Sequence, residues 1–231
     1  MVGNYHRWKE NGERVECRNW LEKEDPDSVA FRFKGFFQFG NLSYDWGKLY
    51  RKDFLIEHEL WVPQYTYAED KAHNFRCCAC EPKYAFVPQS IVLYRENLQS
   101  LTFRPKKRLM KNWIQIAADF ETFLKEHRIA EDYGDIMLFH LVIGAMYLAK
   151  EEMTYRGKKI RVVKSFLKRY GEDPFVRKTL TFGNCLRYAT KIKSVFWKLL
   201  TFTLVLFFRL HAYYFLSAIL VLMSRLGIDS L

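Results

Sequence analysis

The stretch "TYAEDKAHNF", residues 66–75, places two adjacent carboxylates, Glu69 and Asp70, in an otherwise basic chain. Thr66 and Glu69 have the S/T-x-x-E spacing of a capping box, in which each side chain satisfies a backbone amide at the start of a helix. Asp70 then falls in the first helical turn, where the helix dipole stabilises an anion. The pattern therefore predicts a helix from about residue 68 to 80.

The same two acids would also suit catalysis. A general base needs a carboxylate that a rigid element holds beside a cleft, and a loop-to-helix junction meets that need. The stretch alone leaves capping and chemistry open. His73 lies three residues after Asp70 and can share its helix face. We expect this histidine to be solvated or hydrogen-bonded within the fold.

The composition indicates a folded chain with an anionic partner. Apolar residues make up 49% of the 231 residues, and the net charge is +11. Such a charge is typical of proteins that meet nucleic acid, phosphorylated substrates or acidic membranes. Residues 150–198 contain fourteen Lys and Arg but four Asp and Glu, which is close to the whole excess. No nucleic-acid-binding motif accompanies these cations, so we expect no nucleic-acid partner.

The five cysteines argue against a disulfide scaffold, because their number is odd. Three of them form "CCAC" at Cys77, Cys78 and Cys80. This spacing is not that of a zinc site. We therefore expect buried, reduced cysteines and no metal ligands in this chain.

The chain before the basic joint "RPKKR" (104–108) has mixed patterns, and we place a domain boundary at the joint. The elements that we predict there are a hairpin at Asn11–Gly12, a Phe-rich strand over 28–40, extended chain at 46–51, a helix over 52–60 capped by Asp53, a loop around Pro63, and two strands split by Pro88.

Beyond the joint, apolar residues recur at helical spacing. We predict helices at about 109–127 and 132–150, followed by shorter helices in the basic stretch. From Leu199 to Ser224 the chain is almost entirely apolar, and Arg209 interrupts it. Because a bilayer core needs about 20 apolar residues, the pieces on either side are short. The segment is either an interfacial helical hairpin with Arg209 at headgroup level, which the preceding cations favour, or a core helix.

Four elements stand in a recognisable order: "SYDWGKLYRKDFL" (43–55), the Pro63 loop, the Glu69–Asp70 pair and "AFVPQSIVLYRENLQSLT" (85–102). This order resembles the acceptor half of bacterial family 2 glycosyltransferases of the inverting GT-A type, and it covers about residues 1–105. In that family a W-x-K-L-Y/F-R strand, an F-P loop, an E-D pair and a Y-R-x-x-x-x-S element follow one another. The matching residues are Trp46, Gly47, Lys48, Leu49, Tyr50, Arg51, Pro63, Glu69, Asp70, Tyr94, Arg95 and Ser100.

The resemblance implies a role for each matched residue. Asp70 corresponds to the catalytic base, and Glu69 would orient it or bind the acceptor. The substrate-binding candidates are Trp46, as a stacking wall for a sugar ring, and Lys48, Arg51 and Arg95, as phosphate or sugar contacts. For these four, packing or ion-pair roles within the fold remain open.

The resemblance also implies an α/β fold, or α+β as the chain stands. The expected parts are an incomplete GT-A domain (1–105), a helical basic extension (106–198) and an apolar membrane-associated helical segment (199–231). The tail is similar to the C-terminal extensions of bacterial members that modify lipid-linked or cell-surface saccharides.

The chain departs from the family pattern at its front. The family's nucleotide-binding half, with a D-x-D pair that holds a divalent metal, has no counterpart here. "DPD" (25–27) follows no apolar strand and contains Pro26, so we do not expect it to bind metal. We expect no cofactor in this chain, and Mg or Mn only with the missing donor half. The isolated chain should therefore not bind a sugar nucleotide tightly and could be inactive.

Two functions follow as expectations. The first is a glycosyltransferase, or a truncated remnant of one, in polysaccharide biosynthesis of the cell envelope. Its intact relatives move a sugar from a nucleotide diphosphate to a glycan or lipid-linked acceptor. The alternative is a non-catalytic module that binds anionic lipid through the basic helical tail. Both place the chain at the cytoplasmic face of the cell membrane, as a peripheral or monotopic protein.

Overall fold

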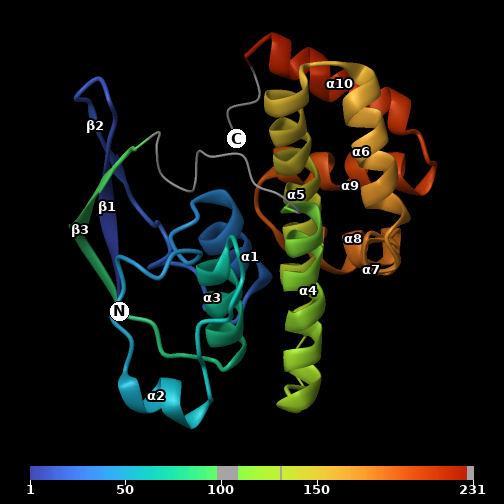
Figure 1. The fold of residues 1–231 in the computed structure, drawn as a ribbon. Coiled ribbons are helices and arrows are strands. Elements are labelled where there is room, and N and C mark those ends of the chain that lie inside the picture. Colours follow the sequence, from blue (N-terminus) through green and yellow to red (C-terminus); the bar gives the residue numbers. More distant parts are fainter. Residues whose placement is uncertain (98–108, 131, 228–231) are drawn as a thin grey trace. The chain divides into compact units, whose positions relative to one another are not determined.

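The computed structural model describes residues 1–97, 109–130 and 132–227, and it shows a mixed α/β chain with a small sheet and many helices (Figure 1). The chain divides into two compact units. Unit 1 comprises Met1–Lys106 and Asp119–Glu131, and unit 2 comprises Lys107–Ala118 and Asp132–Leu231. The expected boundary at 104–108 lies outside the described residues. The mixed composition of helices and strands agrees with the expected α/β class.

The sheet of unit 1 has three strands in the order β2-β1-β3, with β1 in the middle (Figure 1). These are β1 (Val2–Trp8), β2 (Arg14–Cys17) and β3 (Phe86–Arg95). β1 and β2 are antiparallel and join through the turn at Asn11–Gly12, where Gly12 has φ +83°. A positive φ is the conformation that favours glycine in hairpin turns, so the predicted hairpin is confirmed.

β3 runs parallel to β1 as one strand, so the prediction of two strands split by Pro88 is wrong. The pairing moves from Gly3 opposite Val87 to Asn4 opposite Ser90, which passes over the proline. Pro88 has no N–H to give to the ladder, but its carbonyl accepts a hydrogen bond from Nδ2 of Asn4 at 2.9 Å. This bulge lets the strand continue past the proline.

The predicted strand over residues 28–40 is also wrong, because this segment is helical. It forms α1 (Val29–Phe33) followed by the π-helical turn η1 (Lys34–Gln38). Oγ of Ser28 accepts a hydrogen bond from the amide of Phe31 at 3.1 Å and so caps α1. A Phe-rich run satisfies strand alternation and a buried helix equally well, and here the serine cap and the packing decided in favour of the helix.

Helix α3 (Glu69–Ala79) lies at the centre of unit 1 and confirms the helix predicted over 68–80. Its Phe75 is fully buried between Phe36, at a ring distance of 5.0 Å, and Phe120, at 5.7 Å. Phe120 belongs to α4 (Leu109–Glu126), which confirms the helix expected at 109–127. The other predicted helix of this unit is α2 (Lys52–Glu57), which is preceded by Arg51 rather than capped by Asp53.

Unit 2 is helical and is built around α5, whose apolar residues are buried on several sides. α6 packs against both α5 and α10 (Figure 1). The helices expected from the periodicity are confirmed. Their bounds are α5 (Gly134–Arg156), α6 (Ile160–Glu172), α7 (Pro174–Thr179), α8 (Phe182–Tyr188), η2 (Ala189–Lys191), α9 (Val195–Arg209) and α10 (Tyr213–Arg225).

The apolar C-terminal stretch forms α9 and α10, which meet in a turn at Leu210–Ala212. One side of each helix is core: Leu204, Val205 and Phe208 of α9 are buried, as are Leu216 and Val221 of α10. Within residues 1–97, 109–130 and 132–227, no helix is both long enough and apolar enough to cross a bilayer.

A reciprocal pair fixes the start of α4 on α5. The rings of Trp113 and His140 stack at 4.5 Å, and each side chain forms a 2.9 Å hydrogen bond with the other residue's carbonyl. Gly144, one turn after His140, lets the indole lie against the helix backbone. A methyl group at that position would lie 2.1 Å from Nε1 of Trp113.

We therefore predict that Gly144→Ala destabilises the protein. Alanine favours a helix interior by about 1 kcal/mol over glycine, but overpacking a core of this kind costs about 1–3 kcal/mol. Urea unfolding should show a net loss of stability. The matched control is Gly183→Ala in α8, where the nearest atom would be 3.9 Å away. That change should be neutral or stabilising, and equal effects of the two changes would contradict the packing argument.

Candidate functional site

Asp70 lies in the first turn of α3 with one carboxylate oxygen fixed and the other accessible. Oδ1 accepts a hydrogen bond from the amide of Lys71 at 2.7 Å. Among the described residues, Oδ2 accepts no hydrogen bond, and this atom is not fully buried. The carboxylate is therefore anchored through Oδ1, while Oδ2 is only partly covered and has no hydrogen-bond partner among the described residues.

The predicted capping box does not form. The residue that precedes α3 is Ala68, which has a left-handed backbone with φ 60° and makes no side-chain cap. A capping box from Thr66 to Glu69 requires residue 68 to be helical already, and the left-handed conformation of Ala68 prevents this. Glu69 and Asp70 keep their expected place in the first turn, and Glu69 is exposed.

The pKa of Asp70 is raised to about 6, mainly by burial and in smaller part by the negative charges of Glu69 and Asp45, while the amide and the ammonium of Lys71 oppose the shift. Burial also lowers the pKa of Lys71 to about 8. A carboxylate with a pKa of about 6 is a stronger base than an ordinary aspartate and is still ionised at neutral pH. This is the range in which a general base works well.

A set of polar side chains joins α3 to the segment before α2. We call it the Asp45 cluster, and it consists of Asp45, Tyr50, His73 and Asn74. Oδ1 of Asp45 accepts hydrogen bonds from Nδ2 of Asn74 at 2.7 Å and from the Tyr50 hydroxyl at 3.3 Å, and it lies 2.8 Å from Nδ1 of His73. Nδ2 of Asn74 also donates to the backbone carbonyl of Asp70 at 2.8 Å. The cluster thus ties Asp70 to the "YDWGKLY" segment (44–50).

Lys48 completes the cluster as a structural cation. Its ammonium donates to the Leu42 carbonyl and to Oδ1 of Asn74, both at 3.1 Å, and to the Tyr44 carbonyl. An ammonium has three donors, and all three are used. Burial lowers the pKa of Lys48 to about 8, although Asp45 and Asp70 oppose the shift. The substrate-binding role expected for Lys48 draws no support from these contacts.

Cys77, His73 and Asp45 form a relay that has the order of a nucleophilic triad. Sγ of Cys77 lies 3.4 Å from Nε2 of His73, whose Nδ1 faces Asp45. A nucleophilic cysteine must be an accessible thiolate. Cys77 and His73 are both buried, and burial raises the pKa of Cys77 to about 12. The relay therefore satisfies buried polar groups and does not activate the thiol.

Trp46 is packed among tyrosines. Its indole stacks on Tyr44 at 4.5 Å and on Tyr94 at 5.2 Å, and the ring of Tyr5 meets it edge-on at 4.9 Å. These contacts match the packing alternative left open by the sequence. They link the sheet to the Asp45 cluster, and they lend no support to Trp46 as a wall for a sugar ring.

The remaining predicted site residues lie apart from Asp70. Arg51 is exposed and forms a loose ion pair with Asp53 at 3.9 Å. Arg95, also exposed, lies over the ring of Trp8 at 5.5 Å. In the described part of the chain neither arginine has a hydrogen bond or ion pair with Asp70, and Ser100 lies outside the described residues.

Two contributors to this site escaped the sequence prediction, Asp45 and Asn74, and a third, Tyr50, was matched to the motif but given no role. The signal for Asn74 was its position four residues after Asp70, which puts the two side by side on a helix. Asp45 stands next to the matched Trp46, but its partner lies 29 positions away. His73, expected to be solvated or hydrogen-bonded, is hydrogen-bonded and buried.

Across the described ranges no group of three or more His, Cys, Asp or Glu side chains could hold a metal ion. Asp25 and Asp27 of "DPD" lie in the turn before α1, where Oδ1 of Asp25 accepts a hydrogen bond from the Asp27 amide at 3.2 Å. The residues present do not fit the D-x-D metal of the family.

Comparison with known proteins gives one informative match. A Bacillus subtilis (strain 168) protein named "Putative glycosyltransferase EpsH" is 26% identical over 119 residues, which is 50% of this chain and 35% of that protein. The aligned part thus spans about a third of the relative's length. No family model matches the chain, and no solved structure matches it. The weak partial similarity supports a glycosyltransferase relationship.

The shifted pKa of Asp70 predicts that its charge lowers the stability of the fold at neutral pH. Because the folded pKa is about 6 and the ordinary value is 3.8, the ionised carboxylate destabilises the folded state above pH 6, and this effect disappears as the pH falls below about 4. Asp70→Asn keeps the acceptor for the Lys71 amide. It should therefore stabilise the protein by about 1–2 kcal/mol at pH 7.5 and by almost nothing at pH 4.

Denaturant unfolding at the two pH values measures this difference. Asp53→Asn is the matched control, since the side chain of Asp53 is 85% exposed and its replacement should change stability by less than about 0.5 kcal/mol. A destabilised Asp70→Asn protein at pH 7.5 would show that the carboxylate is structural.

The Asp45 cluster predicts the opposite result for its central amide. Asn74→Ala removes the acceptor of Lys48 and Tyr50 and a donor to Asp45. Leaving such buried groups unpaired costs about 2–4 kcal/mol, so the urea midpoint should fall clearly. A loss below about 0.5 kcal/mol would show that the cluster does not hold the site. Gln64→Ala, at an exposed position in the loop before α3, is the control.

Proposed function

We propose that this chain supplies the acceptor side of a glycosyltransferase, with Asp70 as the general base. The observation that carries the proposal is the half-anchored carboxylate: Oδ1 is held by the start of α3, Oδ2 has no hydrogen-bond partner among the described residues, and the pKa is about 6. The partial similarity to a named glycosyltransferase and the order of the acceptor motifs support the same conclusion.

The proposed chemistry is a single displacement with inversion. A hydroxyl oxygen of a saccharide or lipid-linked acceptor attacks the anomeric carbon of a nucleotide-activated sugar, and Oδ2 of Asp70 takes the hydroxyl proton. The bond from the anomeric carbon to the diphosphate oxygen breaks, and the nucleoside diphosphate leaves with that electron pair. One base on the acceptor side is sufficient for this reaction, and the Asp45 cluster keeps it in place.

The roles of the neighbouring residues follow from their contacts. Glu69 is exposed beside Asp70 and would contact the acceptor, while its charge helps to keep the base's pKa high. Lys48 acts through Asn74 as a positioning residue. Arg51 and Arg95 remain proposed contacts for phosphate or sugar. In the loop before α3, the indole of Trp61 is 67% exposed and offers a free ring of the kind that stacks on sugars.

The test is the loss of transfer in Asp70→Asn. Transfer is measured in membranes of cells that express the chain, with a panel of labelled nucleotide sugars, so that a partner chain or donor half is supplied. Removing a general base lowers the rate by about 10²–10⁴-fold. The wild-type rate should rise with pH and level off above about pH 6. Asp53→Asn should transfer at the wild-type rate, and an active Asp70→Asn protein would overturn the proposal.

A second candidate function is contact with an anionic membrane surface through unit 2. The supporting observation is that α9 and α10 each expose an apolar stripe at helical spacing. The residues of the stripes are Val195, Leu199, Leu206 and Leu210, and Phe215, Ile219, Leu222 and Leu226, all between 41% and 67% exposed. Apolar stripes beside many cations are the pattern of helices that lie in a bilayer interface. Asp70→Asn should leave such binding unchanged.

A further inference from the structure

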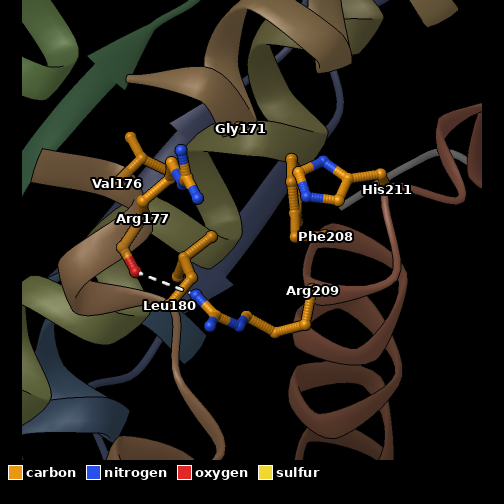
Figure 2. Close-up of a pocket in the computed structure, with 7 residues that line it drawn as sticks. All are labelled: Gly171, Val176, Arg177, Leu180, Phe208, Arg209 and His211. Atoms are coloured by element: carbon orange, nitrogen blue, oxygen red, sulfur yellow. Dashed lines mark hydrogen bonds between the residues drawn. The ribbon is translucent and has the colours of Figure 1, made fainter. Parts of the chain in front are cut away.

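Unit 2 contains a small pocket where the ends of three helices meet. Its volume is about 50 Å³, more than a single water needs and enough for a phosphate-sized group. Figure 2 shows Arg177 and Leu180 on the α7 side, with Phe208, Arg209 and His211 across the gap from them. The lining residues are Gly171, Val176, Arg177, Leu180, Phe208, Arg209 and His211.

The pocket is cationic. Nη1 of Arg209 donates to the backbone carbonyl of Arg177 at 3.5 Å, and Nδ1 of His211 lies 3.1 Å from the Tyr213 hydroxyl. Within the described residues, the guanidinium groups of Arg177 and Arg209 have no carboxylate within ion-pair distance. Most of their donors therefore remain available to a ligand.

The two acids nearest in sequence are already engaged. Glu172 pairs with Lys168 at 3.8 Å, and Oδ1 of Asp173 accepts hydrogen bonds from the amides of Phe175 and Val176 at 2.9 and 3.3 Å. Two guanidiniums beside an imidazole form the donor arrangement that binds phosphate, because each guanidinium can give two parallel N–H bonds. The chemistry of the pocket thus points to a phosphate group.

The surroundings indicate where that phosphate comes from. Leu210 stands between Arg209 and His211 in the turn and is 67% exposed, and Phe215 in the first turns of α10 is 64% exposed. These side chains continue the apolar stripes of α9 and α10. Cations and apolar side chains at one turn match the boundary between headgroups and acyl chains, which a soluble phosphate would not require.

We propose that the pocket binds the phosphate of an anionic phospholipid, with Arg177 and Arg209 on the headgroup and Leu210 and Phe215 in the acyl boundary. The site deepens the membrane-contact function and rests on it, and it is independent of sugar transfer at Asp70.

The experiment compares three double variants of the full chain. The pocket variant is Arg177→Gln with Arg209→Gln, and its matched control is Arg161→Gln with Lys164→Gln, which removes the same charge from an exposed face of α6. The apolar variant is Leu210→Ser with Phe215→Ser. Each is sedimented with phosphatidylglycerol and with phosphatidylcholine vesicles, and each is titrated with inorganic phosphate. Matched circular dichroism and unfolding curves establish that the variants fold.

We expect wild-type protein to bind phosphatidylglycerol vesicles in preference to phosphatidylcholine. The pocket variant should lose this binding at least tenfold more than the control. The apolar variant should lose vesicle binding but keep its affinity for inorganic phosphate. If the pocket variant does not fold, Arg209→Lys, which keeps the charge and loses the planar fork, should show at least a threefold loss.

Three outcomes would overturn the proposal, and they differ in what they reject. Equal losses in the pocket and control variants would reject the pocket but leave membrane contact by general charge. No binding of wild type to phosphatidylglycerol would reject membrane contact itself. Loss of inorganic phosphate binding in the pocket variant, with vesicle binding at the control level, would assign the pocket to a soluble phosphate compound instead of a lipid.

Discussion

The candidate site depends on the hydrogen bonds of the Asn74 side-chain amide. This amide donates to Asp45 and to the backbone of Asp70, and it accepts from Lys48 and Tyr50. One side chain on α3 therefore holds an acid and a cation that would each be unfavourable in this setting alone, because buried charges need partners. The same amide fixes the segment 45–50 against the first turns of α3, which is why the position of Asp70 follows from the cluster rather than from a helix cap.

Two aspartates of this region have been given different environments. Asp45 accepts hydrogen bonds from Asn74 and Tyr50 and faces His73, so its charge is well satisfied. Asp70 accepts a hydrogen bond from one backbone amide, and burial together with the nearby charges of Glu69 and Asp45 raises its pKa to about 6. A carboxylate whose ionised form is poorly stabilised lowers the stability of the fold at neutral pH and is a stronger base. Groups of this kind occur at functional sites more often than elsewhere, and Asp70 is the acid that the acceptor motifs had singled out.

Much of the secondary structure could be predicted from sequence, because local patterns determined it. The hairpin depended on Asn11–Gly12, and α4 and α5 depended on apolar residues at helical spacing, whereas α3 was predicted from a capping-box pattern that does not form. The Phe-rich segment 28–40 was mispredicted because alternation over a short apolar run does not separate a strand from a buried helix. The candidate site could be predicted from the sequence only in part. Asp70 was found from its motif, but the Asp45 cluster joins side chains that lie 24 to 29 positions apart in the sequence. No local pattern shows that all three N–H donors of Lys48 bind groups of the fold.

In unit 2, both the apolar residues and the cations fall into two groups. Helices α9 and α10 bury one face in the core and expose another apolar face. Each helix is therefore a core helix on one side and is suited to a bilayer interface on the other side. The basic residues are likewise divided. Some are paired, such as Arg156 and Arg169 with Glu152. Exposed ion pairs of this kind contribute little to the stability of the fold. Arg177 and Arg209 instead line one pocket and have no ion-pair partner among the described residues, beside exposed Leu210. Net charge brings such a surface to an anionic partner from a distance, whereas donors that line one pocket can recognise a particular group once contact is made.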